Sequence, residues 1–242
     1  MNDIEQYQIW FNNAYCDYYN LYVSSPPSIP QVQEDYEEVD VEGRSDKLII
    51  NKGTYKRDNI KINFSLIDKS DYITSLDKAL DYLLDYTDNF LKIDRMDRAY
   101  AVKKVIVGDI TREYLSKGSF DVEFVVEPLA TTSTITHYSY MSGYEVYNDG
   151  NYATDDLKIV LNTTVGSNIT FTLNNTDTFT INNSPNKIMI DCNAMTCSDI
   201  NKTTNYMNKM TGNFPTLKKG TNTITTSSNV DSFVLYYRKK YR

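Results

Sequence analysis

Hydrophobic and polar side chains alternate strictly between residues 60 and 67. The apolar members of this run are Ile60, Ile62, Phe64 and Leu66, and lysine, asparagine and serine stand between them. A period of two is typical of a β-strand with one face against a core. The apolar run at 48–50 predicts a second strand, and the sequence Asn-Lys-Gly at 51–53 predicts a turn between the two strands.

The period changes between residues 71 and 90. Apolar side chains there recur at the spacing of a helix with one buried face, and we expect the helix at about 74–88. Either Ser70 or Thr74, the latter with Asp77 three residues later, is expected to cap its N-terminus. The aspartates at 81, 85 and 88 fall on the solvated face. The positions expected to be buried are Ile73, Leu76, Leu80, Leu83, Leu84 and Thr87.

Strand patterns return after residue 91. Residues 98–107 and 118–127 favour strands, and Glu127-Pro128 ends the second of these runs. Beyond it, threonine, asparagine and serine dominate, and short strand candidates separated by turn residues indicate a sandwich. These candidates lie at 144–147, 157–161, 168–173, 178–181, 187–191, 222–226 and 232–237.

The first 23 residues carry a dense aromatic cluster. Asn12-Asn13 predicts a turn between two short strands, and the prolines at 26, 27 and 30 predict an extended linker. We expect the hairpin to cap its own domain or to reach a neighbouring subunit. The aromatic members are Tyr7, Trp10, Phe11, Tyr15, Tyr18, Tyr19 and Tyr22.

The order of these features resembles the distal tail protein (Dit) family of siphophages that infect Gram-positive bacteria. The resemblance begins at the turn Gly43-Arg44-Ser45-Asp46, where the family usually has Gly-Arg-Asp-Gly, so the last two positions depart from the pattern. It continues through Glu127-Pro128, through a strand ending at Asp191, and through the run 214–224 near the C-terminus. It implies a mainly β protein. Residues 1–128 would form a β-barrel-like domain with one α-helix, and residues 129–242 a galectin-like β-sandwich.

Composition and charge argue against several classes of function. The formal net charge is −7, which argues against a general nucleic-acid binder, because phosphate contacts need a basic face. The sequence contains no apolar run long enough for a membrane span and no signal-peptide pattern at its start, so we expect synthesis in a cytoplasm without membrane insertion. Cys16, Cys192 and Cys197 are expected to be free thiols, and neither a zinc site nor another cofactor is indicated.

The resemblance implies a structural, non-enzymatic hub at the virion tail tip, assembled in the host bacterial cytoplasm. A homo-hexamer would join the tail-tube protein to the tail-tip protein and to receptor-binding or baseplate proteins, and DNA would pass through its channel without specific binding. The expected subunit contacts are Trp10, Phe11, Arg44, Tyr55, Ile60, Ile62 and Phe64. The expected channel lining is Glu37, Glu38, Asp40 and Glu42, part of an acidic segment spanning 34–46.

Other functions stay open from the sequence. A carbohydrate-binding module of a host-adhesion device could use an aromatic platform, and a tail-tube-like protein would form long tubes. The candidate sugar or partner contacts are Tyr138, Tyr140, Tyr144, Tyr147 and Tyr152, although an AT-rich genome also explains the 21 tyrosines. His137 is the one histidine and lacks a paired nucleophile pattern, so catalysis finds little support. The basic end, 238–242, either pairs with a neighbour's acidic patch or forms a solvated tail.

Overall fold

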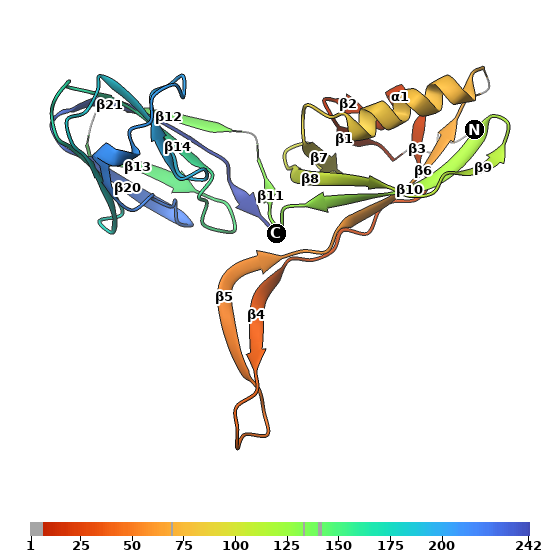
Figure 1. The fold of residues 1–242 in the computed structure, drawn as a ribbon, viewed down its shortest axis with the longest axis horizontal. Coiled ribbons are helices and arrows are strands. Elements are labelled where there is room, and N and C mark those ends of the chain that lie inside the picture. Colours follow the sequence, from red (N-terminus) through yellow and green to blue (C-terminus); the bar gives the residue numbers. More distant parts are fainter. Residues whose placement is uncertain (1–6, 69, 133, 140–141) are drawn as a thin grey trace. The chain divides into compact units, whose positions relative to one another are not determined.

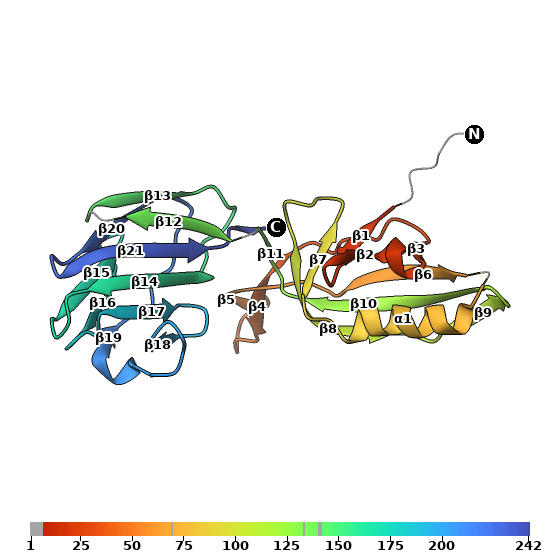
Figure 2. The ribbon, with the colours of Figure 1, turned by 90° about the horizontal axis from the view of Figure 1, so that it is seen from above.

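Alternating burial organises both halves of the chain. The computed structural model describes residues 7–68, 70–132, 134–139 and 142–242. It divides the chain into two compact units: unit 1 runs through Thr131, and unit 2 spans Thr132–Tyr241 (Figures 1 and 2). The chain is mainly β, as predicted, and α1 (Tyr72–Leu84) is the only α-helix in the described residues. Within those residues no helix is long and apolar enough to cross a membrane.

Unit 1 is built on a curled antiparallel sheet. Its strand order is β2-β1-β7-β8-β10-β6-β3, and β9 pairs with the end of β10. The elements are β1 (Ile9–Phe11), β2 (Ala14–Tyr15), the 3-10 turn η1 (Cys16–Tyr19), β3 (Leu21–Val23), β6 (Ile60–Ile67), β7 (Phe90–Ile93), β8 (Tyr100–Val107), β9 (Thr111–Tyr114) and β10 (Lys117–Val126). The predicted alternation of β6 is confirmed, because its four apolar side chains are buried and the residues between them are not. The Asn12-Asn13 turn is also confirmed, with both residues at positive φ.

The helix α1 packs on this sheet through a face that only partly overlaps the one predicted. Ile73, Leu84 and Thr87 are exposed, and α1 ends at Leu84 rather than near residue 88. The physical reason is that two tyrosines flank the helix face that meets the core. Tyr72 and Tyr82 are buried, and the Tyr82 ring stacks on Tyr19 with a centroid distance of 4.3 Å. Leu83 is buried as expected, and Leu76 and Leu80 are half-buried. The buried positions of α1 are Tyr72, Ser75, Ala79, Tyr82 and Leu83.

The start of α1 is fixed by two aspartates rather than by Ser70 or Thr74. The Asp71 carboxylate accepts a hydrogen bond from the Thr74 backbone N–H at 3.1 Å, which is the N-cap interaction. Asp68 accepts hydrogen bonds from the Ser75 hydroxyl and from the Ser70 hydroxyl and backbone N–H. These donors hold the pKa of the Asp68 carboxyl well below its ordinary value.

A long hairpin leaves the unit 1 sheet between β3 and β6. It consists of β4 (Gln33–Val39) and β5 (Leu48–Lys56), and we call it the arm (Figure 1). The turn predicted at 51–53 is wrong. Asp35 pairs with Thr54 and Tyr36 with Asn51, so Lys52 and Gly53 bulge out of a continuous strand. Gly53 has φ 71°, and its N–H donates to the Asn51 side chain at 2.8 Å.

Unit 2 is a sandwich of two five-stranded antiparallel sheets, as predicted. One has the order β12-β21-β14-β17-β18, and the other has the order β13-β20-β15-β16-β19. The strands are β12 (Ile135–Ser139), β13 (Tyr144–Asn148), β14 (Leu157–Thr163), β15 (Ile169–Leu173), β16 (Asp177–Ile181), β17 (Lys187–Asp191), β18 (Thr196–Ser198), β19 (Met210–Gly212), β20 (Gly220–Thr226) and β21 (Val230–Tyr237), with the 3-10 turn η2 (Met207–Lys209). In its core the Phe171 ring stacks on Phe179 and packs edge-on against Phe233. The short strands β11 (Ala130–Thr131) and β22 (Lys240–Tyr241) complete the chain.

The expectation that the basic end is a solvated tail is wrong. The residues from Arg238 to Lys240 form ion pairs inside unit 2, and Lys240 and Tyr241 form the strand β22. Arg238 contacts Asp156 at 3.3 Å, Lys239 pairs with Asp149, and Lys240 pairs with Asp155. Pairing of this end with a neighbour's acidic patch stays a prediction.

The expectation of free thiols is confirmed, since the three cysteines are buried and unbridged.

Replacing Asp68 by Asn is expected to make unit 1 less sensitive to acid. Because the folded pKa of Asp68 lies below its ordinary value of 3.8, the ionised carboxylate stabilises the fold above that pH, and this contribution is lost as the pH falls further. Urea titrations should show a lower midpoint for Asp68→Asn than for the wild type at neutral pH, and the gap should narrow under acid. Asp81→Asn, on the exposed face of α1, is the matched control. A gap that stayed constant with pH would contradict this role of Asp68.

Candidate functional site: surfaces for partners

The arm exposes apolar side chains that a soluble monomer would be expected to bury. Ile49 is 65% exposed, and Leu48, Ile50 and Tyr36 are also exposed. Within the described residues the arm forms a two-stranded sheet of its own, so both of its long edges are unpaired. Isolated two-stranded hairpins are marginally stable in water, and open edges invite pairing with another chain. These features identify the arm as a surface suited to a partner.

Ion pairs on the arm are mostly solvent-exposed. Lys47 contacts Glu38 at 3.1 Å, and Asp35 lies 3.9 Å from both Lys52 and Lys56. Exposed pairs of this kind contribute little to stability, so they do not compensate for the exposed apolar surface. The four candidate channel residues, Glu37, Glu38, Asp40 and Glu42, are all exposed on β4 or in the turn that follows it.

The base of the arm is fixed to the unit 1 sheet. The Arg57 guanidinium lies over the Tyr100 ring, 4.8 Å from its centroid, which is a cation–π contact. Asn59 donates a hydrogen bond to Glu123 on β10 at 2.6 Å. Both contacts come immediately after β5, so they hold the point where the arm joins β6.

The predicted subunit contacts fall into two groups. Phe11, Ile60, Ile62 and Phe64 are buried in unit 1's own core, so their side chains are not available to a neighbour. Trp10, Arg44 and Tyr55 lie at the surface or are half-buried. The surface candidates are thus on the N-terminal hairpin and on the arm.

The aromatic N-terminal hairpin forms a compact patch around Trp10. Its ring packs edge-on against Tyr15 with a centroid distance of 5.0 Å, and the Lys92 ammonium lies 5.5 Å from the ring centroid. Tyr18 follows in η1 and is 81% exposed. A shallow hollow is lined by these three aromatic side chains together with Ala14 and Asp17.

The candidate sugar platform is not assembled by the tyrosines of β13. Tyr144 points toward the core and packs edge-on against Phe233, whereas Tyr147 is 66% exposed. Three residues apart on a strand, the two side chains emerge on opposite faces. Tyr152 is half-buried beyond the end of β13. Tyr140 lies outside the described residues, and of Tyr138 the structure describes only its place in β12.

His137 is held between two tyrosines. Its Nδ1 lies 3.3 Å from the Tyr144 hydroxyl and its Nε2 lies 3.5 Å from the Tyr237 hydroxyl, and its ring stacks on that of Tyr237. Burial lowers the pKa of His137, and the nearby Lys239 lowers it further. These contacts are those of a packing residue.

The described residues also contain no group of three or more metal-ligating side chains placed to hold an ion.

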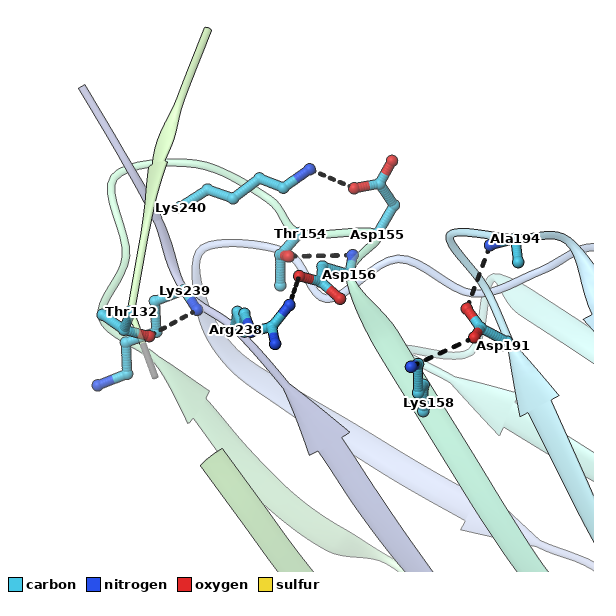
Figure 3. A network of polar contacts seen from close by, with 10 residues as sticks. All are labelled: Thr132, Thr154, Asp155, Asp156, Lys158, Asp191, Ala194, Arg238, Lys239 and Lys240. Atoms are coloured by element: carbon cyan, nitrogen blue, oxygen red, sulfur yellow. Dashed lines mark hydrogen bonds and ion pairs between the residues drawn. The ribbon is translucent and has the colours of Figure 1, made fainter. Parts of the chain in front are cut away.

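Sequence reasoning missed a groove on the outer face of one unit 2 sheet. It has a volume of about 620 Å³ and runs over β21, β14 and β17. Its floor includes Val160, Met189 and Val234. Figure 3 shows the polar network at one end, where Asp156 faces Arg238 and Lys158 faces Asp191 at 3.5 Å. The sequence signal that could have indicated this groove is the alternation along residues 158–162. The side chains that point outward there are Lys158, Val160 and Asn162, so the outer face of this strand is both cationic and apolar.

Comparison with solved structures gives an informative match, whereas the sequence comparisons do not. Neither the protein-family models nor the curated protein sequences contain a match to this chain. Among solved structures, the chain is similar to the crystal structure of the SPP1 Dit protein (gp 19.1), with a TM-score of 0.69 and 11% sequence identity. The alignment covers 98% of this chain and 99% of that chain. SPP1 Dit is described there as a paradigm of the hub adsorption apparatus in phages that infect Gram-positive bacteria. Over nearly its whole length, therefore, this chain has the fold of a phage distal tail hub protein.

Proposed function

We propose that this chain is the distal tail hub of a phage tail, a structural protein that assembles into a closed homo-hexameric ring between the tail tube and the tail tip. The observation that carries this proposal is the structural match to SPP1 Dit, because it covers 98% of this chain and therefore both units. A single shared domain would be weaker support, since common folds host many unrelated functions.

The arm supports ring assembly on physical grounds. Its exposed Leu48, Ile49 and Ile50 are stabilised only when a second surface removes them from water. If the arm of each copy lies on a different surface of the next copy, the contact is heterologous, and repetition closes a ring. The aromatic patch around Trp10 is a second candidate for this contact.

The two units would have different functions in the assembled tail. Unit 1, which carries the arm, would build the ring and its channel. Unit 2 would hold receptor-binding or baseplate proteins, and the two ends of the ring would meet the tail-tube protein and the tail-tip protein. The protein would then belong to the virion tail tip.

The acidic strand of the arm suits a channel for DNA. Glu37, Glu38, Asp40 and Glu42 are exposed and extend along β4 and the following turn. Carboxylates that line a pore repel phosphates, so DNA would pass without adhering.

Disrupting the exposed apolar surface of the arm should prevent ring assembly. Multi-angle light scattering of the wild-type chain is expected to give the mass of about six copies, or of two such rings. Ile49→Asp should raise the concentration needed for half-assembly by at least about tenfold, because a buried apolar contact becomes a charged one.

The matched control is Val165→Asp, which places the same charge at an exposed position of unit 2. It should leave the mass unchanged. Circular dichroism should show that both variants keep the wild-type fold. A wild-type chain that stayed monomeric at high concentration, or an Ile49→Asp chain that still formed rings, would contradict the role given to the arm.

Neutralising the acidic strand should make the ring retain DNA. A variant carrying Glu37→Gln, Glu38→Gln, Asp40→Asn and Glu42→Gln is expected to bind short duplex DNA in low salt, whereas the wild-type ring should not. The binding should weaken as salt is added, since it depends on phosphate contacts. Electrophoretic mobility of a labelled duplex measures this effect. Equal DNA mobility with both rings would argue against a channel lined by β4.

A further inference from the structure

The groove of unit 2 has an apolar centre between polar ends. In the register of the sheet, Val160 of β14 lies opposite both Val234 of β21 and Met189 of β17, so these three side chains form one row across the sheet. Val160 is buried and the other two are half-buried. Ile200, 40% exposed in the loop after β18, also lines this hollow. The middle of the groove therefore offers an aliphatic floor.

Cations lie toward both ends of this floor. Lys187 pairs in register with Asn162 on one side of the apolar row, while Lys158 and Arg238 lie on the other side. Two of the three cations are already paired within unit 2, because Arg238 contacts Asp156 at 3.3 Å and Lys158 contacts Asp191 at 3.5 Å. Lys187 is exposed and makes no ion pair within the described part of the chain. The cation that can receive a ligand is therefore Lys187, at one end of the groove.

The length of the groove suits an extended chain. Asp156, directly before β14, and Asn162 in β14 are six residues apart in the sequence, and both line it. At the rise of a β-strand this separation is about 20 Å, the length of about six extended residues. Tyr236 is half-buried at one side, and a floor made of valine and methionine lacks the broad aromatic face on which a sugar ring stacks.

We propose that this groove binds an extended segment of a partner protein that is apolar at its centre and carries a carboxylate at one end. The aliphatic row receives the apolar side chains, and Lys187 receives the carboxylate. This inference deepens the proposed function, because it names the chemistry by which a hub would hold an adsorption protein. The experiment that tests this inference measures peptide binding by unit 2 and does not depend on ring formation.

The test uses the full-length protein and a fluorescein-labelled heptapeptide with blocked ends, Glu-Thr-Val-Thr-Val-Thr-Thr, whose glutamate and both valines emerge on one face of the extended chain. Anisotropy titrations in low salt are expected to show binding that weakens by about tenfold when the glutamate is replaced by glutamine. Lys187→Glu should weaken binding of the acidic peptide by about tenfold and should strengthen binding of the same peptide with lysine in place of the glutamate. Lys219→Glu makes the same charge change outside the groove, and it should leave both affinities unchanged.

Several results would overturn the proposal. They are no binding of the acidic peptide up to about 1 mM, equal binding of the acidic and glutamine peptides, or loss of binding in Lys219→Glu as large as in Lys187→Glu. A Lys187-dependent change in the mass of the protein alone would assign the groove to a second copy instead. Because ring mass is measured separately, a ring that forms but binds no acidic peptide would reject this inference and leave the hub function standing.

Discussion

The exposure of apolar side chains on the arm is the constraint on which the proposed assembly depends. Leu48, Ile49 and Ile50 extend into solvent on a two-stranded hairpin whose edges are unpaired within the described residues. Burial of apolar area is the dominant favourable term in folding and association, so a hairpin of this kind is stabilised chiefly by what covers it. The rest of unit 1 is consistent with this requirement, because Arg57 and Asn59 fix the base of the arm to the sheet and leave its length free for a neighbour.

Each unit has its own core, which lets the two perform separate tasks. Unit 1 is stabilised by the apolar face of β6 and by the tyrosines of α1, whereas unit 2 is stabilised by a cluster of phenylalanines between its two sheets. A unit with its own core keeps its fold when its surface changes, and surface residues can then adapt to different partners. The arm and the groove are both surface features of this kind. The arm is apolar with acidic flanks, and the groove is apolar with an exposed lysine, Lys187, at one end.

Periodicity predicted the strands well, but it predicted the bulge in the arm and the buried face of the helix poorly. The strict alternation of residues 60–66 identified β6, and the asparagine pair at 12–13 identified a tight turn, because each depends on local chemistry alone. The bulge at Lys52 and Gly53 was interpreted as a turn, since a glycine at positive φ serves either geometry and only the partner strand distinguishes them. The predicted buried face of α1 differs from the observed one because Tyr72 and Tyr82, which carry hydroxyls, were not counted as core residues. The groove depends on the register of three strands far apart in sequence, which no local pattern contains.

The most direct measurement of the central claim is a cryo-electron microscopy reconstruction of the assembled protein. The account predicts a closed ring in which the arm of each copy lies against the neighbouring copy, Ile49 is buried in that contact, and β4 faces the channel. A ring in which the arms remain in solvent, or a contact formed by unit 2 alone, would contradict the account. Such a result would leave the fold unchanged and would assign the arm to a partner outside the ring.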